Sequence, residues 1–236
     1  MEVIRAAEKL KETLWGKDIN IILDKTSDGK RYVPKKYIES LGLLQLNCHE
    51  QNGLLIRPEY DAALNMPTFD REQAIRDEDC GVIVGGLPGI GTFSLPIIKQ
   101  LPLNANPGKS IFLYYLLFRL LSGKIPVAFE IDQTFVVFQD EGVSEYFLNV
   151  DGNLLPPNSW ALSDSSATNK QPCTPFLRAA RLRRTWIIQA TSPSPERWKS
   201  WKKDYNATFF VMEPFSIDEM TALGLAIWVS EVFLVR

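Results

Sequence analysis

The spacing of apolar residues changes character near residue 80. Beyond that point, short runs rich in β-branched and aromatic residues alternate with longer apolar or amphipathic stretches. The short runs predict strands over 82–85, 127–131, 134–138, 160–162, 185–190 and 208–212. The longer stretches predict helices over 109–121, 195–203 and 216–228. Strands that alternate with helices are typical of a parallel sheet with crossover helices, so we expect an α/β fold.

The first 80 residues follow a different pattern. An amphipathic helix is predicted over 1–15, where apolar residues recur at helical spacing: Val3, Ala7, Leu10 and Leu14. A second helix is expected over 58–64, because proline suits a first helical turn. The stretch 70–80 is strongly charged, and we interpret it as the segment that directly precedes the first strand of the sheet. We therefore expect a mainly helical N-terminal appendage, residues 1–80, and an α/β domain, residues 81–236.

Composition and charge argue against several classes of function. The chain has 236 residues, 45% of them apolar, and a net charge of −2, which gives no electrostatic footprint for nucleic-acid or anionic-membrane binding. Three cysteines without C-x-x-C spacing argue against a disulfide framework or a zinc site. The N-terminus does not read as a secretory signal, and the apolar stretch 223–235 is too interrupted to span a bilayer. We expect an intracellular protein, in cytoplasm or nucleus, whose C-terminus is truncated directly after an apolar run.

Two glycine-bearing fragments stand between the first predicted strand and its helix. Gly86-Leu87-Pro88-Gly89-Ile90-Gly91 follows the strand, and Gly108-Lys109-Ser110 opens the helix. Neither fragment alone is a phosphate-binding motif, because the first continues into Thr92 instead of lysine. Joining Gly91 to Lys109 gives Gly-Leu-Pro-Gly-Ile-Gly-Lys-Ser, the pattern of the phosphate-binding Walker A loop. Strand, glycine loop and helix is also the context that this loop requires.

The segment 92–108 separates the two fragments, and we interpret it as a retained intron. Its coding length is that of a short intron, and the Gly91-Thr92 and Pro107-Gly108 junctions can be encoded with GT and AG dinucleotides in matching phase. Removing what lies between them leaves a single glycine codon. The alternative is a genuine surface insertion, since loops tolerate added length at modest entropic cost.

The joined loop assigns chemistry to particular residues. We expect Lys109 to neutralise β- and γ-phosphate oxygens and Ser110 to bind Mg²⁺. The glycines of the loop let the backbone close on phosphate; they are Gly86, Gly89, Gly91 and Gly108. The anion would lie at the N-terminus of the helix over 109–121, where free amides and the helix dipole favour it.

A nucleotide-hydrolysing site also needs an acidic residue at the end of a neighbouring strand. Asp164 closes the run Trp160-Ala161-Leu162-Ser163-Asp164 and is our first choice as the catalytic carboxylate that holds Mg²⁺ and polarises the attacking water; the alternative is a loop aspartate that caps the next segment. Glu130, inside an apolar strand, is the second choice, against the alternative of a sheet-edge residue. Thr191, at the end of another strand, is a candidate for sensing the γ-phosphate, and its alternative role is to cap the helix that follows.

Two other groups of residues do not support a catalytic function. The basic cluster before the strand over 185–190 could supply an arginine to the reaction, but a solvated face explains it as well; its members are Arg178, Arg181, Arg183 and Arg184. The only histidine, His49, adjoins Cys48, and adjacent side chains diverge on a helix or strand. Cysteine-protease, serine-hydrolase and zinc-enzyme functions are therefore not supported.

Several stretches resemble the Crinkler-like P-loop NTPases, found in fungi and oomycetes and related to the retrotransposon-hot-spot ATPases. Besides the joined loop and its tyrosine-rich helix, they include Leu55-Ile56-Arg57-Pro58-Glu59-Tyr60, Trp160-Ala161-Leu162-Ser163-Asp164, the patch 190–199 and the stretch 211–220. The resemblance implies an ASCE-type parallel sheet that binds ATP and Mg²⁺, with Asp164 in the Walker B position. Some members are host-directed effectors, and some carry a nuclease domain after the NTPase. The chain departs from the family in its interrupted loop and its lack of a ubiquitin-like header.

These observations lead to one functional hypothesis and one rival. The chain is expected to be a P-loop NTPase domain whose intact form hydrolyses ATP with Mg²⁺, and whose interrupted loop impairs this polypeptide. The rival is an inactive interaction module or effector-type remnant that keeps the fold. The expected partner is nucleotide, with no membrane or nucleic-acid binding, and any protein partner is unidentified.

Overall fold

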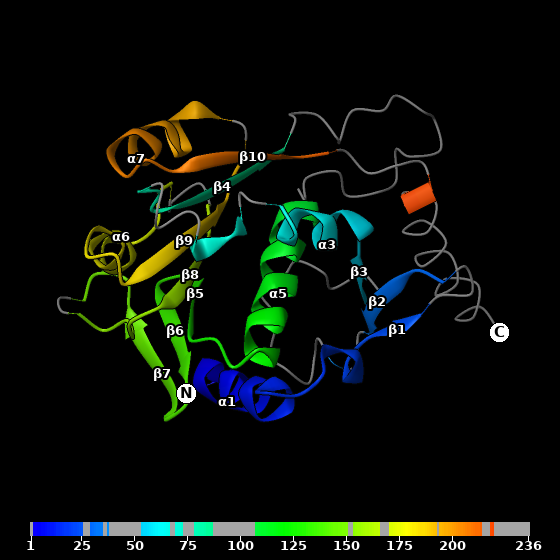
Figure 1. Cartoon of the computed structure of the whole chain (residues 1–236). Helices are drawn as coiled ribbons and strands as arrows, with labels where there is room; N and C mark the ends of the chain where they lie inside the picture. The colour runs from blue at the N-terminus through cyan, green and yellow to red at the C-terminus, as the bar shows by residue number, and fades with distance from the viewer. Residues whose placement is uncertain are drawn as a thin grey trace.

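A computed structural model gives the fold. It describes residues 2–25, 29–34, 37, 53–66, 69–72, 78–86, 107–150, 153–165, 170–192, 194–213 and 218–219. Within these ranges the chain forms two sheets and the helices that pack on them (Figure 1).

The larger sheet has seven strands in the order β10-β4-β9-β8-β5-β6-β7. The first five strands of this order run parallel to one another: β10 (Thr208–Met212), β4 (Gly81–Gly86), β9 (Thr185–Ala190), β8 (Ser159–Asp164) and β5 (Val127–Ile131). An antiparallel meander completes the sheet through β6 (Thr134–Gln139) and β7 (Gly142–Phe147). The expected α/β class with a mostly parallel sheet is confirmed.

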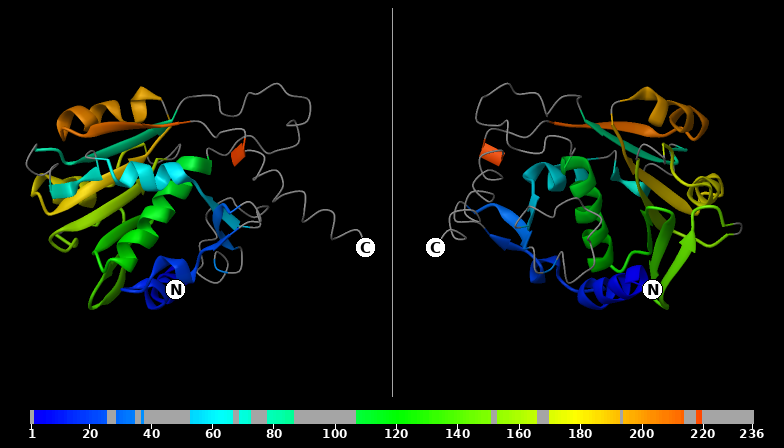
Figure 2. Two further views of the ribbon diagram at one scale, coloured as in Figure 1. Left: turned by 45° about the vertical axis from the view of Figure 1, so that its right-hand side comes forward. Right: turned by 180° about the vertical axis from the view of Figure 1, so that it is seen from behind.

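Helices cover both faces of this sheet. Helix α5 (Pro107–Ser122) crosses one face, and α6 (Thr174–Arg181), the short 3₁₀ helix η4 (Pro195–Arg197) and α7 (Lys199–Asp204) lie on the other (Figure 2). Strands buried on both faces need apolar side chains at consecutive positions. All six residues of β4 and of β9 are buried, and apart from Thr185 and Gln189 of β9 they are apolar residues or glycine.

The N-terminal region packs against the outer side of α5. It consists of α1 (Glu2–Leu14), the 3₁₀ turn η1 (Ile19–Ile21), α3 (Pro58–Leu64) and a small antiparallel sheet of β1 (Asp24–Lys25), β2 (Arg31–Pro34) and β3 (Gly53–Ile56). In Figure 1 the first turn of α5 lies beside α3 and its last turn beside α1. Helix α5 is thus enclosed between the large sheet and the N-terminal region.

This enclosure explains the composition of α5. Nearly every residue from Gly108 to Leu121 is buried, with Arg119 the exposed exception. A helix that is apolar all round needs cover on all sides. One hydrophobic cluster therefore runs from the N-terminal helix to the sheet and includes Leu14, Tyr60, Phe112, Val84 and Leu162.

Several elements differ from the sequence-based expectations. The helices over 1–15 and 58–64 are confirmed, but the N-terminal region also contains three strands that the apolar spacing did not predict. Strand β7 and helix α6 were not predicted either. Most of the helix expected over 216–228 lies outside the described residues. Within the described part of the chain, no helix is long and apolar enough to cross a membrane.

Candidate functional site

The site is built at the edge of the sheet where the parallel strands end. The register pairs Asp164, the last residue of β8, with Ala190, the last residue of β9. Val84 of β4 pairs with the same Ala190, so β4, β9 and β8 end side by side. Helix α5 begins at this edge, because Lys109 in its first turn lies close to Gly86 at the end of β4. Ligand sites in open α/β sheets form at this edge.

Lys109 is the central cation of the site. Its side chain is buried, and an ideal Cβ placed on Gly86 would lie 3.1 Å from its Nζ. Burial lowers the pKa of this amine, and the carboxylate of Asp164 partly opposes the shift. The two glycine fragments that the sequence separates are therefore adjacent in space at Gly86 and Lys109, so part of the predicted loop is brought together.

Asp164 lies beside the same first turn of α5. Burial raises the pKa of its carboxyl, while a hydrogen bond from the side chain of Ser110 and the charges of Lys109 and Arg197 lower it. The hydroxyl of Ser110 and the carboxylate of Asp164 thus form a hydrogen-bonded pair of oxygen groups. Oxygen ligands of this kind are those that Mg²⁺ prefers. Among the described residues, no group of three or more His, Cys, Asp and Glu side chains gathers as a metal site.

Thr191 follows β9 at the same edge, and its hydroxyl is already engaged. It accepts a hydrogen bond from Ser165 Oγ at 2.9 Å and donates to the carbonyl of Ser192 at 3.2 Å. Its backbone N–H donates to the carbonyl of Val84 at 3.0 Å. Thr191 does not cap η4, since the N-cap residue of that helix is Ser194. These bonds tie together the chain segments that leave β8, β9 and β4.

Glu130 lies on the opposite face of the sheet from Lys109. Its carboxylate accepts hydrogen bonds from the Ser163 side chain and the Cys173 backbone N–H, at the start of α6. Burial raises its pKa to about 7, and the nearby charge of Asp164 acts in the same direction. The structure therefore gives Glu130 a packing role between β5, β8 and α6. The predicted catalytic role has no contact with Lys109 or Ser110 to support it.

Arg197 is a charged residue of this site that sequence reasoning did not select. It ends η4, the turn that follows β9, and its charge lowers the pKa of Asp164. Its Nε is buried, and no described residue accepts a hydrogen bond from it. The sequence signal was that Arg197 belongs to the patch 190–199, one of the stretches that carry the family resemblance. Two cations, Lys109 and Arg197, therefore act on the single carboxylate of Asp164, an arrangement suited to an anionic ligand.

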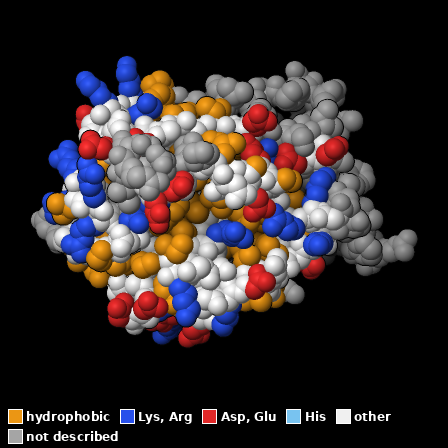
Figure 3. All heavy atoms as spheres, in the orientation of Figure 1, with side chains coloured by type: hydrophobic (Ala, Val, Ile, Leu, Met, Phe, Trp, Pro, Cys, Tyr) orange, Lys and Arg blue, Asp and Glu red, His pale blue; other side chains and the backbone are white. Residues whose placement is uncertain are grey.

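The basic cluster near α6 lies elsewhere. Arg183 forms an exposed ion pair with Glu78 at 3.1 Å, and Arg181 stacks over Tyr205 with its guanidinium 4.7 Å from the ring centre. These residues precede β9, so they lie at the opposite edge of the sheet from Asp164. Figure 3 shows Lys and Arg side chains spread over α6 and α7 on the surface. The solvated-face interpretation agrees with these contacts.

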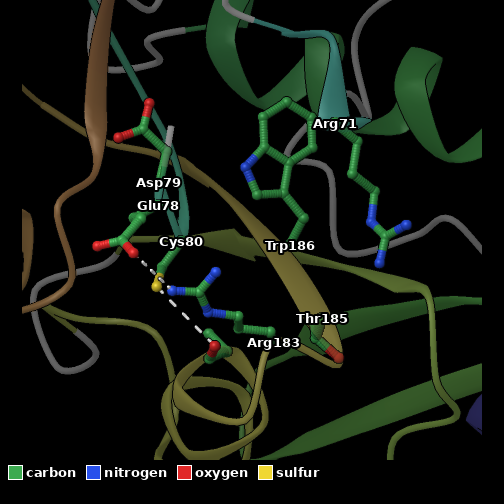
Figure 4. Close-up of a pocket in the computed structure, with 8 residues that line it drawn as sticks. Arg71, Glu78, Asp79, Cys80, Arg183, Thr185 and Trp186 are labelled. Carbon is green, nitrogen blue, oxygen red and sulfur yellow. Dashed lines mark hydrogen bonds and ion pairs between the residues drawn. The ribbon is translucent and has the colours of Figure 1, made fainter. Parts of the chain in front are cut away.

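A shallow hollow exists at that opposite edge, where β4 and β9 begin (Figure 4). It is lined by Arg71, Glu78, Asp79, Cys80, Ala180, Arg183, Thr185 and Trp186. Both positive and negative side chains line it, and Arg183 is paired with Glu78. The hollow shares no residue with the group around Lys109, and we assign it no role in the chemistry.

Some predicted residues cannot be located relative to the site. Gly89 and Gly91, which the joined loop requires, lie outside the described residues, as do Cys48 and His49. Gly108 lies in the first turn of α5 and is buried. Cys80 and Cys173 are both free thiols.

Comparisons with known proteins add no relative. No family model matches the chain, and neither the search of curated proteins nor the search of solved structures gives a match. The likeness to Crinkler-like NTPases therefore rests on the motifs in the sequence.

Proposed function

We propose that this domain is built to bind ATP with Mg²⁺ and that its intact form hydrolyses the nucleotide. One observation carries the proposal: Gly86, Lys109, Ser110 and Asp164 come from three separate elements and meet at the carboxyl edge of the parallel sheet. A surface turn with a glycine has no need of a buried lysine. An anion cradle does, because the ammonium must lie within reach of phosphate oxygens.

The order of the strands supports the same proposal. Strand β9 is inserted between β4, which leads into the glycine fragment, and β8, which ends in Asp164. The family resemblance implies an ASCE-type parallel sheet, and this order of parallel strands supports that reading.

Each side chain has a role that its position allows. Lys109 would bind phosphate oxygens, and the free amides of the first turn of α5 would add to the attraction. The oxygens of Ser110 and Asp164 would hold Mg²⁺, which when bound neutralises charge on the phosphates. Arg197 would supply positive charge to the outermost phosphate. The single carboxylate of Asp164 balances only one of the two cations beside it, Lys109 and Arg197, so one positive charge remains for the ligand. Positioning and charge, without covalent catalysis, account for the reaction.

The interruption of the loop should weaken nucleotide binding by this polypeptide. Twenty-two residues, 87–108, separate Gly86 from Lys109, whereas the joined motif has only five between them. Backbone amides of a tight loop must converge on one phosphate. We therefore propose that the chain with residues 92–108 binds nucleotide poorly and that their deletion restores the cradle.

Calorimetric titration with ATP and Mg²⁺ tests the proposal on four proteins: the full chain, the form lacking 92–108, and that form with Lys109→Ala or with Lys203→Ala. The deleted form should bind, and Lys109→Ala should weaken binding by at least about tenfold, because a charged hydrogen bond to phosphate is lost. The exposed Lys203 lies in α7, and its removal should leave affinity unchanged. If the deleted form binds no nucleotide, the rival of an inactive interaction module is favoured instead.

A further inference from the structure

The side chain of Tyr60 reaches from the N-terminal region into the first turn of α5. Tyr60 lies in α3 and is fully buried. Its hydroxyl donates a hydrogen bond of 2.8 Å to the backbone carbonyl of Gly108, the residue directly before Lys109. The contact joins residues far apart in the chain, so it depends on the tertiary fold alone.

From this contact we propose that Tyr60 is a positioning residue of the phosphate site, which sets the backbone that carries Lys109. The inference rests on the proposed function. It extends that function by giving the N-terminal region a part in nucleotide binding that neither the loop motif nor the resemblance assigns.

Tyr60 is well placed to act as a fixed reference point. Its ring packs edge-on against Phe112 with centroids 5.5 Å apart and lies 6.0 Å from the ring of Tyr115. Burial raises the pKa of its hydroxyl well above the usual range for tyrosine, so the group remains a hydrogen-bond donor at every working pH. The ring cannot turn away without opening the core.

The start of α3 is itself held in place by a buried ion-pair cluster. Arg57, the N-cap residue, donates to both carboxylate oxygens of Glu219 at 2.9 and 3.1 Å and lies 2.6 Å from Glu59. Glu59 in turn accepts a 2.7 Å hydrogen bond from the backbone N–H of Glu213, just after β10. Helix α3 is thus fixed to the chain beyond the sheet on one side and to α5 on the other.

The position of the Gly108 peptide matters because Lys109 has little space. The Nζ atom of Lys109 lies so close to Gly86 that a Cβ added there would be 3.1 Å away. A shift of the first turn of α5 would therefore move the ammonium relative to the end of β4. Misplacement of a reacting or binding group by about 1 Å is enough to lower activity by as much as a hundredfold. In the form lacking 92–108, Gly91 takes the place of Gly108, so the carbonyl before Lys109 is still present as the acceptor.

A matched control exists in the same helix. The hydroxyl of Tyr115 donates to Asp61 of α3, which is also paired with Arg31. Tyr115→Phe therefore removes one tyrosine hydrogen bond between α3 and α5, as Tyr60→Phe does. It does so about two helical turns away from Lys109.

The first experiment uses the full chain and needs no nucleotide. The rate at which an amine-reactive acylating reagent modifies Lys109 is measured by mass spectrometry, with the exposed Lys203 as internal reference. Tyr60→Phe should raise the Lys109 rate at least threefold, whereas Tyr115→Phe should leave it within a factor of two at equal loss of thermal stability. Equal rates in both variants would overturn the inference.

The second experiment measures ATP affinity in the form lacking 92–108. Tyr60→Phe should raise the dissociation constant about three- to tenfold, the worth of one hydrogen bond, and Tyr115→Phe should change it less than twofold. An unchanged affinity in Tyr60→Phe would contradict a positioning role. If the unmutated deleted form binds no ATP, the proposed function fails, and the labelling experiment still decides the role of Tyr60.

Discussion

Two adjacent glycines at the end of β4 face opposite sides of the sheet and have different tasks. A Cβ on Gly85 would lie 2.4 Å from the Phe209 ring, while one on Gly86 would lie 3.1 Å from Nζ of Lys109. Gly85 is therefore required for packing of the sheet. Gly86 leaves room for the ammonium group of Lys109, as a phosphate-binding site would require.

This difference predicts separate effects of two alanine substitutions. Gly85→Ala should lower the free energy of unfolding by about 1–3 kcal/mol through overpacking, and should leave the reactivity of Lys109 unchanged. Gly86→Ala should lower stability less, because a flexible lysine can move aside, but it should displace the ammonium and weaken ATP binding in the form lacking 92–108. Urea denaturation and calorimetric titration measure the two effects. Equal effects of both variants on binding would argue against the assignment.

The raised pKa of Glu130 predicts a pH-dependent stability. The folded state holds the proton up to about pH 7, while the unfolded carboxyl releases it near its usual value of 4.5. The folded state thus binds more protons between these values, so stability falls as pH rises through this window. Glu130→Gln removes this titration. Between pH 4.5 and pH 8, the free energy of unfolding of the variant should therefore rise by up to about 3 kcal/mol relative to that of the unmutated protein.

Urea denaturation at both pH values checks this prediction, and a difference that does not change with pH would refute it. The same variant tests the catalytic alternative. A packing role predicts a hydrolysis rate within about threefold of the unmutated deleted form. Loss of a general base would instead lower the rate at least about a hundredfold.

At the residue scale the sequence was informative where the signal is local. Lys109, Ser110 and Asp164 follow from a motif and from the end of an apolar run, and the structure brings these three together. Arg197 was not selected, because its approach to Asp164 depends on how η4 folds back over the sheet edge. Glu130 was a second choice because it is acidic and lies in an apolar strand, and the contacts of its carboxylate with Ser163 and Cys173 depend on tertiary packing.

Helix α5 is the element around which the others are arranged. It carries Lys109 and Ser110 at one end, lies on the sheet with one side and is covered by α1, α3 and the small sheet on the other. Its apolar sequence identified it as a buried helix. Strands β2 and β3 were missed because each is only four residues long, too short for a period to be read.

The cluster around Arg57 predicts a large cost for a single substitution. Arg57→Met leaves Glu59 and Glu219 without their buried cation and should lower the free energy of unfolding by about 3–5 kcal/mol. The exposed pair of Arg183 and Glu78 is the control, and Arg183→Met should cost less than about 1 kcal/mol. Chemical denaturation measures both. Similar small losses in the two variants would show that the cluster does not fix α3.

At the scale of the whole molecule, the N-terminal region and the sheet share one hydrophobic cluster. Leu14 of α1 and Val84 of β4 both belong to it. A shared core favours a single cooperative transition. The sequence separated residues 1–80 as an appendage because its periodicity differs, but periodicity carries no information about which surfaces pack together.

Leu14→Ala should therefore destabilise the sheet as well as the N-terminal helix. The side chain is fully buried, and its truncation should cost about 2–5 kcal/mol. Urea unfolding followed by far-ultraviolet circular dichroism and by tryptophan fluorescence should shift together to lower denaturant. Two separate transitions, with only the first displaced, would mean that the regions fold independently.

If Gly86 and Lys109 belong to one phosphate-binding loop, an acyl-phosphate derivative of ATP should react with Lys109. A lysine amine beside the phosphates attacks the acyl carbonyl, forms an amide and releases ATP, so the labelled residue identifies the phosphate site. In the form lacking 92–108 we predict that Lys109 is labelled and that excess ATP with Mg²⁺ prevents this. ATP-protected labelling at other lysines, or no protected labelling of Lys109, would contradict the account.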